Sequence, residues 1–185
     1  IAGHAIDWID EHEATHRGEP FFLYVAFTSP HFPIQALPED IARYRDRYRE
    51  GWDRTRLRRL ERQRALGIVD TSLSARDPKT APSWNTPEAE LAKRIGPGEV
   101  DHAVAWDDLD SEQKALQATK MAIHAAMVDR MDREIGRIVA RLEASRHLDD
   151  TIIVVASDNG ASAEILIRGD GHDPAAPPGS AKTFL

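Results

Sequence analysis

The stretch TIIVVASDNG, residues 151–160, decides the predicted fold. Its first six residues form an apolar, largely β-branched run with little polar alternation, which is typical of a strand buried on both faces of a parallel sheet. Ligand sites in open α/β sheets lie just beyond the carboxyl ends of such strands, where Asp158 and Asn159 stand. A carboxylate beside an amide carbonyl suits Ca²⁺ or Mg²⁺ better than zinc or copper. The stretch therefore predicts half of a divalent-cation site, where Gly160 lets the backbone turn sharply or approach a ligand, with an ordinary Asx turn after the strand as the alternative.

A second apolar run, FFLYVAF at residues 21–27, predicts another buried strand. It ends in the loop TSPHFP, in which two prolines flank His31 and restrict the backbone to extended or turn geometry. His31 is either a functional imidazole or a turn histidine that fills a hydrogen bond. If both strands lie parallel in one sheet, their carboxyl ends bring His31 to Asp158 and Asn159. A cation holding a substrate oxygen, with an imidazole that protonates the leaving group, fits hydrolysis of a phosphate or sulfate ester.

Two other parts of the sequence have apolar residues at the spacing of a helix. Apolar residues at helical spacing open the chain, and a long helix is predicted from Asp110 or Ser111 to about Arg146. On its exposed side, Asp129 and Arg133 are spaced for an i,i+4 ion pair. This helix leads into the run at 151–156, so the sequence predicts an α/β fold with a mixed, largely parallel sheet flanked by helices.

The middle of the chain is rich in arginine and then in proline. Ten arginines lie between residues 43 and 64, while Tyr44, Tyr48 and Trp52 recur every fourth residue. This spacing favours a solvated amphipathic helix packed through one aromatic stripe, with a surface for an anionic substrate or partner as the alternative. Residues 67–110 predict a long surface excursion with short helices near residues 86–91 and at Ser111. The role of the arginine-rich segment and of the excursion stays open.

Composition excludes several classes of protein. A net charge of −7 argues against a general nucleic-acid binder, and the absence of cysteine excludes disulfides, thiolate metal sites and a cysteine nucleophile from these residues. No apolar run approaches the length needed to cross a bilayer, so we expect no membrane partner. The compartment and the oligomeric state stay open. Both ends of the sequence run on without start or stop signals, so we expect an interior segment of a longer protein.

Three motifs, in the same order, resemble the type I sulfatases. They are the strand and P-H-x-P-x-Q segment at residues 20–36, the helix MVDRMDREIGRI at 127–138, and the strand ending in S-D-N-G at 151–160. The resemblance spans most of the chain and implies the central part of a catalytic domain of the alkaline phosphatase superfamily, over residues 1–185. Residues 41–110 would then be a variable helical and loop insertion within this domain.

The resemblance also implies roles for three residues. Asp158 and Asn159 would bind an active-site Ca²⁺, with Mg²⁺ as the alternative, and His31 would contact the sulfate ester and help to protonate the departing alcohol. The family nucleophile is a formylglycine in a C/S-x-P-x-R motif, which these residues lack. We therefore expect a parent enzyme that hydrolyses small-molecule sulfate esters, while the isolated chain is inactive. The alternatives are a phosphoryl or phosphonate ester hydrolase of the same superfamily, or an inactive binding module.

Overall fold

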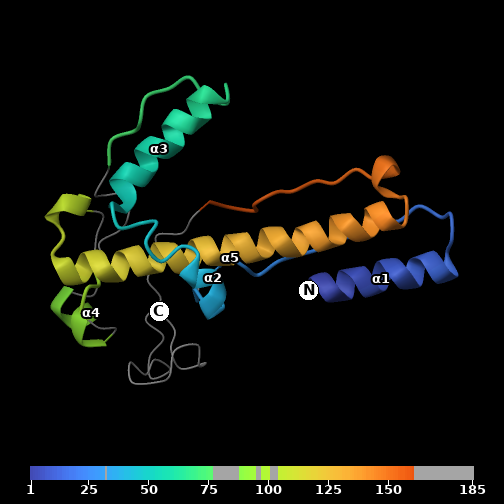
Figure 1. Ribbon diagram of the computed structural model, residues 1–185, viewed down its shortest axis with the longest axis horizontal. Helices are drawn as coiled ribbons and strands as arrows, with labels where there is room; N and C mark the ends of the chain where they lie inside the picture. The colour runs from blue at the N-terminus through green and yellow to red at the C-terminus, as the bar shows by residue number, and fades with distance from the viewer. Residues whose placement is uncertain (32, 77–87, 95–96, 101–103, 161–185) are drawn as a thin grey trace. The chain divides into compact units, whose positions relative to one another are not determined.

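The computed structural model describes residues 1–31, 33–76, 88–94, 97–100 and 104–160 (Figure 1). Its elements are the helices α1 (Ala2–Thr15), α2 (Pro38–Ala42), α3 (Gly51–Ala65), α4 (Glu88–Arg94) and α5 (Ser111–Ala144), with the 3₁₀ turns η1 (Trp106–Asp108) and η2 (Leu148–Asp150). They divide into two compact units. Unit 1 comprises residues 1–32 and 127–160, and the described part of unit 2 lies within residues 33–126.

The predicted α/β fold is wrong for the part of the chain that the structure describes, which contains helices and no strand. Residues 21–27 and 151–156 run without regular secondary structure, and their large side chains face solvent: Phe22 is 88% exposed and Ile152 is 92% exposed. Along 21–27 half-buried and exposed residues still alternate, as they do on an extended backbone. The β-branched and aromatic runs thus favour extended geometry, but a strand also needs a paired neighbour, which neither run has among the described residues.

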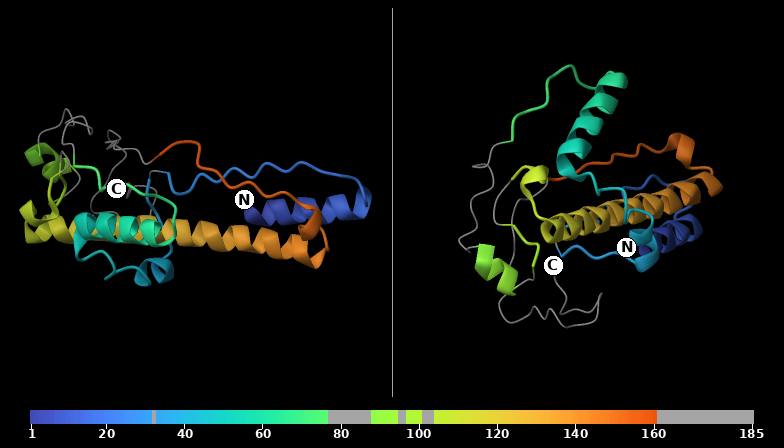
Figure 2. Two further views of the ribbon diagram at one scale, coloured as in Figure 1. Left: turned by 90° about the horizontal axis from the view of Figure 1, so that it is seen from above. Right: turned by 60° about the vertical axis from the view of Figure 1, so that its left-hand side comes forward.

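Unit 1 contains α1 and the C-terminal part of α5, which lie side by side (Figures 1 and 2). Residues Ala2, Ala5 and Ile9 of α1 are buried at helical spacing, which confirms the predicted opening helix. Two polar contacts join this helix to the other segment: Asp10 pairs with Arg141, and Glu13 pairs with His147 just beyond α5. The burial pattern and these two pairs hold α1 in register along α5.

The long helix α5 begins where the sequence predicts. The carboxylate Oδ1 of Asp110 accepts hydrogen bonds from the backbone N–H groups of Glu112 and Gln113, both at 2.8 Å. In return, the Gln113 side chain accepts a hydrogen bond of 3.0 Å from the Asp110 N–H, so the two residues form a reciprocal capping box. The predicted pair between Asp129 and Arg133 is also present, at 3.3 Å. Capping and ion pairing thus agree with the helical pattern read from the sequence.

The core of unit 2 is aromatic. Trp106, Leu109 and Ala118 are buried together, and Tyr48 and Trp52 pack against them. The rings of Trp52 and Trp106 meet edge to face at 5.0 Å, and the indole N–H of Trp52 donates to the Val104 carbonyl at 3.1 Å. This core fastens the start of α3 to η1.

The predicted continuous helix over the arginine-rich segment is only partly right. The helix α3 begins at Gly51, whereas Tyr44 and Tyr48 lie in the turns that follow α2. Gly51 has a φ of +78°, a left-handed conformation that glycine adopts without a steric penalty. Tyr48 and Trp52 still reach the core as the aromatic spacing suggested, but a turn rather than a helix places the tyrosine.

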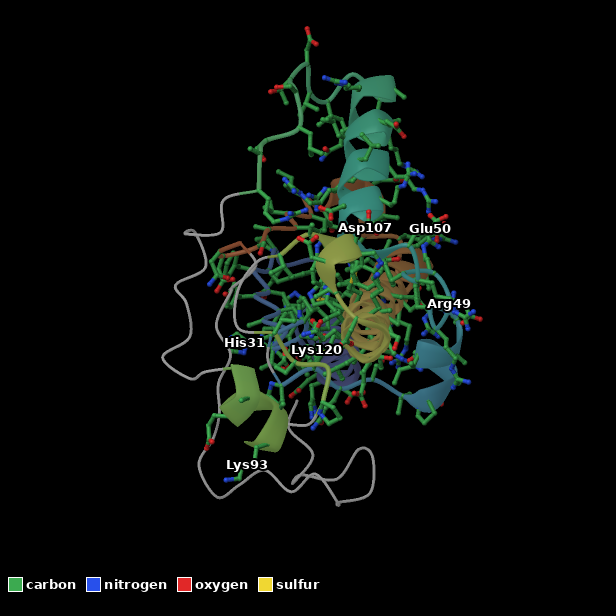
Figure 3. All side chains as sticks on the ribbon, turned by 90° about the vertical axis from the view of Figure 1, so that its left-hand side faces the viewer. His31, Arg49, Glu50, Lys93, Asp107 and Lys120 are labelled. Atoms are coloured by element: carbon green, nitrogen blue, oxygen red, sulfur yellow. The ribbon has the colours of Figure 1, made fainter. Side chains whose placement is uncertain are left out.

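A buried acidic residue in unit 2 is neutralised locally. Glu99 is only 3% exposed and forms an ion pair with Lys120 of α5, which is labelled in Figure 3. The side-chain amide of Gln117 donates to the same carboxylate at 3.2 Å and to the Gly98 carbonyl at 2.9 Å. These contacts satisfy the charge and polar groups that burial would otherwise penalise, so this cluster is structural.

Of two predictions about the middle of the chain, one is confirmed and the other stays untested. The short helix expected near residues 86–91 is present as α4, although residues 77–87 lie outside the described part of the chain. The insertion over residues 41–110 stays a prediction. Among the described residues, no helix combines the length and the apolar character that crossing a bilayer requires.

Candidate functional site

The predicted cation ligands Asp158 and Asn159 lie at the end of the extended run 151–156, in unit 1. Both residues are exposed and sit in a bend. The Ser157 hydroxyl donates a 2.6 Å hydrogen bond to the Asn159 backbone carbonyl, which closes the bend around the Asp158 side chain. The two residues are thus consecutive in one bend, and both are open to solvent.

The donor chemistry of this pair fits part of a calcium shell. A carboxylate and an amide oxygen are both hard donors, and Ca²⁺ takes six to eight oxygen ligands in proteins. The described residues contain no cluster of three or more His, Asp or Glu side chains that could hold a metal. Asp158 and Asn159 alone would supply too few donors to retain a cation, so the metal site stays a prediction.

The other predicted site residue, His31, lies in the turn that ends the extended run 21–27. It is exposed, and its backbone N–H donates to the Thr28 carbonyl at 3.0 Å, which shapes the turn. His31 belongs to the same compact unit as Asp158 and Asn159, although no sheet edge connects them. The structure thus presents an accessible imidazole in the unit that carries the two oxygen donors.

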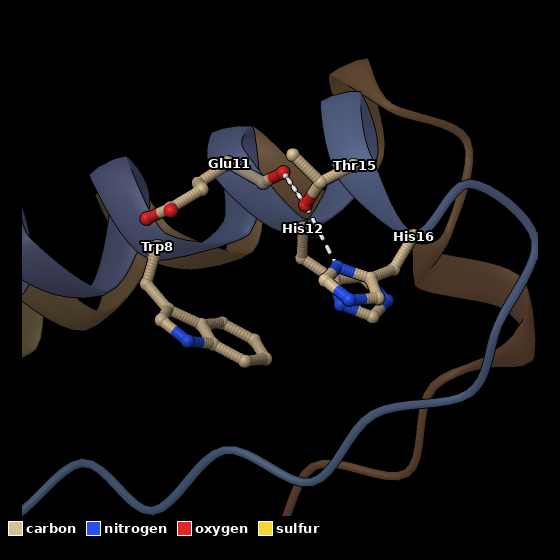
Figure 4. A pocket seen from close by; sticks show the side chains of 5 residues that line it. All are labelled: Trp8, Glu11, His12, Thr15 and His16. Atoms are coloured by element: carbon tan, nitrogen blue, oxygen red, sulfur yellow. Dashed lines mark hydrogen bonds between the residues drawn. The ribbon is translucent and has the colours of Figure 1, made fainter.

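A shallow pocket of about 310 Å³ lies elsewhere in unit 1, along one face of α1 (Figure 4). It is lined by Trp8, Glu11, His12, Thr15 and His16. The rings of Trp8, His12 and His16 stack in turn, with centroids 5.3 Å and 5.4 Å apart. None of these residues was predicted from the sequence, although the spacing of four residues between the three rings is the signal that would have found them.

Hydrogen bonds set the tautomers of both imidazoles in this pocket. The Thr15 hydroxyl donates to the Glu11 carbonyl at 2.7 Å, so its oxygen accepts the 2.7 Å hydrogen bond from Nδ1 of His16. Likewise Nε2 of His12 lies 3.0 Å from the Glu19 carbonyl, which only accepts, so this nitrogen is the donor. Both side chains are thus tied to the fold of α1 and its following turn.

Comparison of the sequence with known proteins and protein families gives three matches. The chain matches the Sulfatase family over residues 1–182. It is 35% identical over 160 residues to an uncharacterized sulfatase of Schizosaccharomyces pombe (strain 972 / ATCC 24843), covering 85% of this chain and 25% of the relative. It is 33% identical over 157 residues to an arylsulfatase of Klebsiella aerogenes, covering 84% of this chain and 28% of the relative.

The chain belongs to the sulfatase family. The predicted resemblance is confirmed, and it extends across nearly the whole sequence. This sulfatase chain spans about a quarter of the length of the curated relatives it matches.

Within the sulfatase chain, Glu13 and His147 form a polar contact that responds to pH. The hydrogen bond with His147, helped by the positive charges of Arg141 and Arg17, holds the pKa of Glu13 below its ordinary value of 4.5. A carboxyl group whose pKa is lower in the folded state stabilises that state above its ordinary pKa, and this contribution is lost as the pH falls through the folded-state pKa.

We therefore expect Glu13→Gln to lower the melting temperature near neutral pH, where the ionised carboxylate binds His147. The difference from the unchanged protein should shrink as the pH falls below 4.5 and should vanish once Glu13 is protonated in the folded protein. Thermal unfolding followed by circular dichroism along a pH series measures this. Glu11→Gln, on the same helix, is the control and should show no such convergence; a difference for Glu13→Gln that stays constant with pH would contradict the expectation.

Proposed function

We propose that the protein containing this chain hydrolyses sulfate esters, and that Asp158, Asn159 and His31 belong to its active site. The observation that carries the proposal is the match to the Sulfatase family over residues 1–182. The 33% identity to an arylsulfatase supports the same reaction class. The finer assignments rest on the chemistry of the three side chains and on their exposure in one compact unit.

Asp158 and Asn159 would hold the cation through a carboxylate oxygen and the side-chain amide oxygen. Ca²⁺ fits this donor pair, and Mg²⁺ is the alternative. When bound, such a cation neutralises negative charge on the ester and on the group that attacks it. Asp158 supplies the negative charge that retains the cation, whereas Asn159 adds a neutral donor, so replacing Asp158 should weaken cation binding more than replacing Asn159.

His31 would transfer a proton to the leaving oxygen of the ester. A ring N–H of an imidazole is suited to donate a proton to a departing alkoxide. Its position in a short turn, with an exposed ring, leaves it accessible to a small sulfate ester. The nucleophile is proposed to lie outside residues 1–185, as are the remaining cation ligands, so the isolated chain should not turn over substrate.

The natural full-length protein should hydrolyse an aryl sulfate much faster than the corresponding aryl phosphate, and a calcium chelator should abolish the reaction. Replacing the removed Ca²⁺ should restore the rate. Asp158→Ala should raise the Ca²⁺ concentration needed for half-maximal rate, while Asp132→Ala, an exposed acidic residue on α5, should leave it unchanged. A preference for the phosphate ester would move the assignment to phosphoryl transfer, and failure to hydrolyse either ester would point to an inactive binding protein.

A further inference from the structure

The arginines around α3 divide into two structural groups. One group folds back onto the protein: Arg56 donates to the Ser74 carbonyl at 2.8 Å, Arg64 to the Thr71 carbonyl, and Arg76 pairs with Asp53. These contacts tie residues 71–76 to one side of α3. They account for only part of the positive charge in this region.

The second group points outward. Arg54, Arg59 and Arg62 are exposed and have no hydrogen-bond or ion-pair partner within the described ranges, whereas Arg58 pairs only with the equally exposed Glu50. A pair with both side chains about 60% exposed contributes little to stability and exchanges readily with other anions. The structure therefore leaves these guanidinium groups available to a ligand.

Helical geometry arranges the outward group in a row. Arg54, Arg58 and Arg62 are four residues apart, so they lie along one face of α3 at a rise of about 6 Å per step. This face is opposite Leu60, which is 7% exposed and is the buried side chain in the body of the helix. Arg59 lies beside the row. We refer to Arg54, Arg58, Arg59 and Arg62 as the arginine row.

The packing of α3 makes this row accessible. The first turn of the helix is fixed to η1 through the tryptophan core, while Arg56 and Arg64 of the later turns contact residues 71–76 on another side of the helix. Glu50 and Asp107 both lie at the fixed end (Figure 3). Glu61 flanks the row as an exposed acidic residue. Asp70, also exposed, follows the helix, so the four arginines of the row outnumber these two acidic residues.

The charge of the segment is also opposite to that of the chain. Residues 43–64 hold ten arginines and four acidic residues, a net charge of +6, in a chain whose net charge is −7. An isolated positive segment on an acidic protein attracts polyanions locally while the remaining surface repels them. Arginine is suited to this role, because its planar guanidinium binds two oxygens of one anionic group.

We propose that the arginine row binds a sulfated polysaccharide, as a docking surface made of residues other than those proposed for the active site. The choice of a sulfated polymer over other polyanions rests on the proposed function, since an enzyme that removes sulfate would meet such chains as substrates. Repeated charges along the polymer match a repeated row of arginines better than one small ester does. The row thus raises the local concentration of polymeric substrate without taking part in the reaction.

The test uses the natural full-length protein with heparin as the probe. Arg54→Gln/Arg59→Gln/Arg62→Gln should bind heparin at least about tenfold more weakly near 0.15 M salt. The dependence of affinity on salt should also become shallower, by roughly one unit of slope per lost contact if heparin behaves like a duplex polyanion. A matched triple variant, Arg17→Gln/Arg133→Gln/Arg137→Gln, removes the same charge from exposed arginines outside residues 43–64 and should bind heparin almost normally.

Three outcomes would overturn the proposal. They are no binding of heparin by the unchanged protein, equal weakening in both triple variants, and tighter binding of a single-stranded DNA of similar charge. Circular dichroism should show both variants folded, because the substituted residues are exposed. Hydrolysis of a small aryl sulfate distinguishes failure of this proposal from failure of the proposed function. The variant Arg54→Gln/Arg59→Gln/Arg62→Gln should hydrolyse this ester at the normal rate. A protein that binds heparin through the row but hydrolyses no sulfate ester would contradict only the proposed function.

Discussion

His31→Ala in the natural full-length protein should lower the turnover of an alkyl sulfate by about 10²–10⁴-fold, the usual effect of removing a general acid. An alkoxide is a poor leaving group, so its departure depends strongly on protonation. The measurement is the steady-state rate at saturating substrate, before and after the substitution. His4→Ala is the matched control, because this histidine is exposed on α1 of the same unit, and the rate should not change.

The leaving group distinguishes proton transfer from a structural role of His31. With an activated aryl sulfate, whose phenolate leaves without help, the loss caused by His31→Ala should be much smaller than with the alkyl ester. Equal losses for both esters would indicate that His31 shapes the turn, and unchanged rates for both would contradict its assignment to the site.

Gly51→Ala should destabilise the protein by about 3–5 kcal/mol, because it combines a backbone penalty with a steric overlap. A methyl group at Gly51 would lie 1.9 Å from Cδ2 and 2.2 Å from Cγ of Trp106. Trp106 cannot move away freely, since its ring packs against Trp52 and its backbone N–H donates to Asp53 at 2.9 Å. Thermal or denaturant unfolding measures the loss, which corresponds to roughly 6–20 °C in the melting temperature.

Gly67→Ala separates the two causes. Gly67 also has a left-handed backbone, with φ +69°, but nothing lies within 4 Å of the added carbon. This variant should therefore show only the backbone penalty, about 1–2 kcal/mol. If both substitutions have the same effect, the tight contact between Gly51 and Trp106 does not contribute, and the account of how α3 is anchored is wrong.

Helical features were the most predictable part of the fold. The apolar spacing from Leu116 to Leu142 and the cap at Asp110 are local properties, because a helix satisfies its own backbone hydrogen bonds. The start of α3 at Gly51 was missed, since the tyrosine and tryptophan spacing continues across it, and the close approach of Trp106 to Gly51 involves a residue far along the sequence. Local pattern thus specified the type of element better than its boundaries.

Strands could not be predicted in the same way. The runs at 21–27 and 151–156 have the composition of buried strands, but pairing depends on a second segment that the pattern does not identify. The candidate site shares this difficulty. The chemical character of His31, Asp158 and Asn159 is visible in the sequence, whereas their common location was argued from a sheet that the described residues do not form.

The exposed runs have a practical consequence for work with the isolated chain. Residues 21–27 and 151–156 are uncharged and free of proline, and Phe22, Tyr24, Ile152 and Val154 are more than 80% exposed. Segments of this composition, with unpaired backbone groups, associate between molecules and seed aggregation. These two runs rather than the helices should therefore limit the yield of soluble chain. A charged residue in place of Phe22 or Val154 should reduce association between molecules and raise this yield.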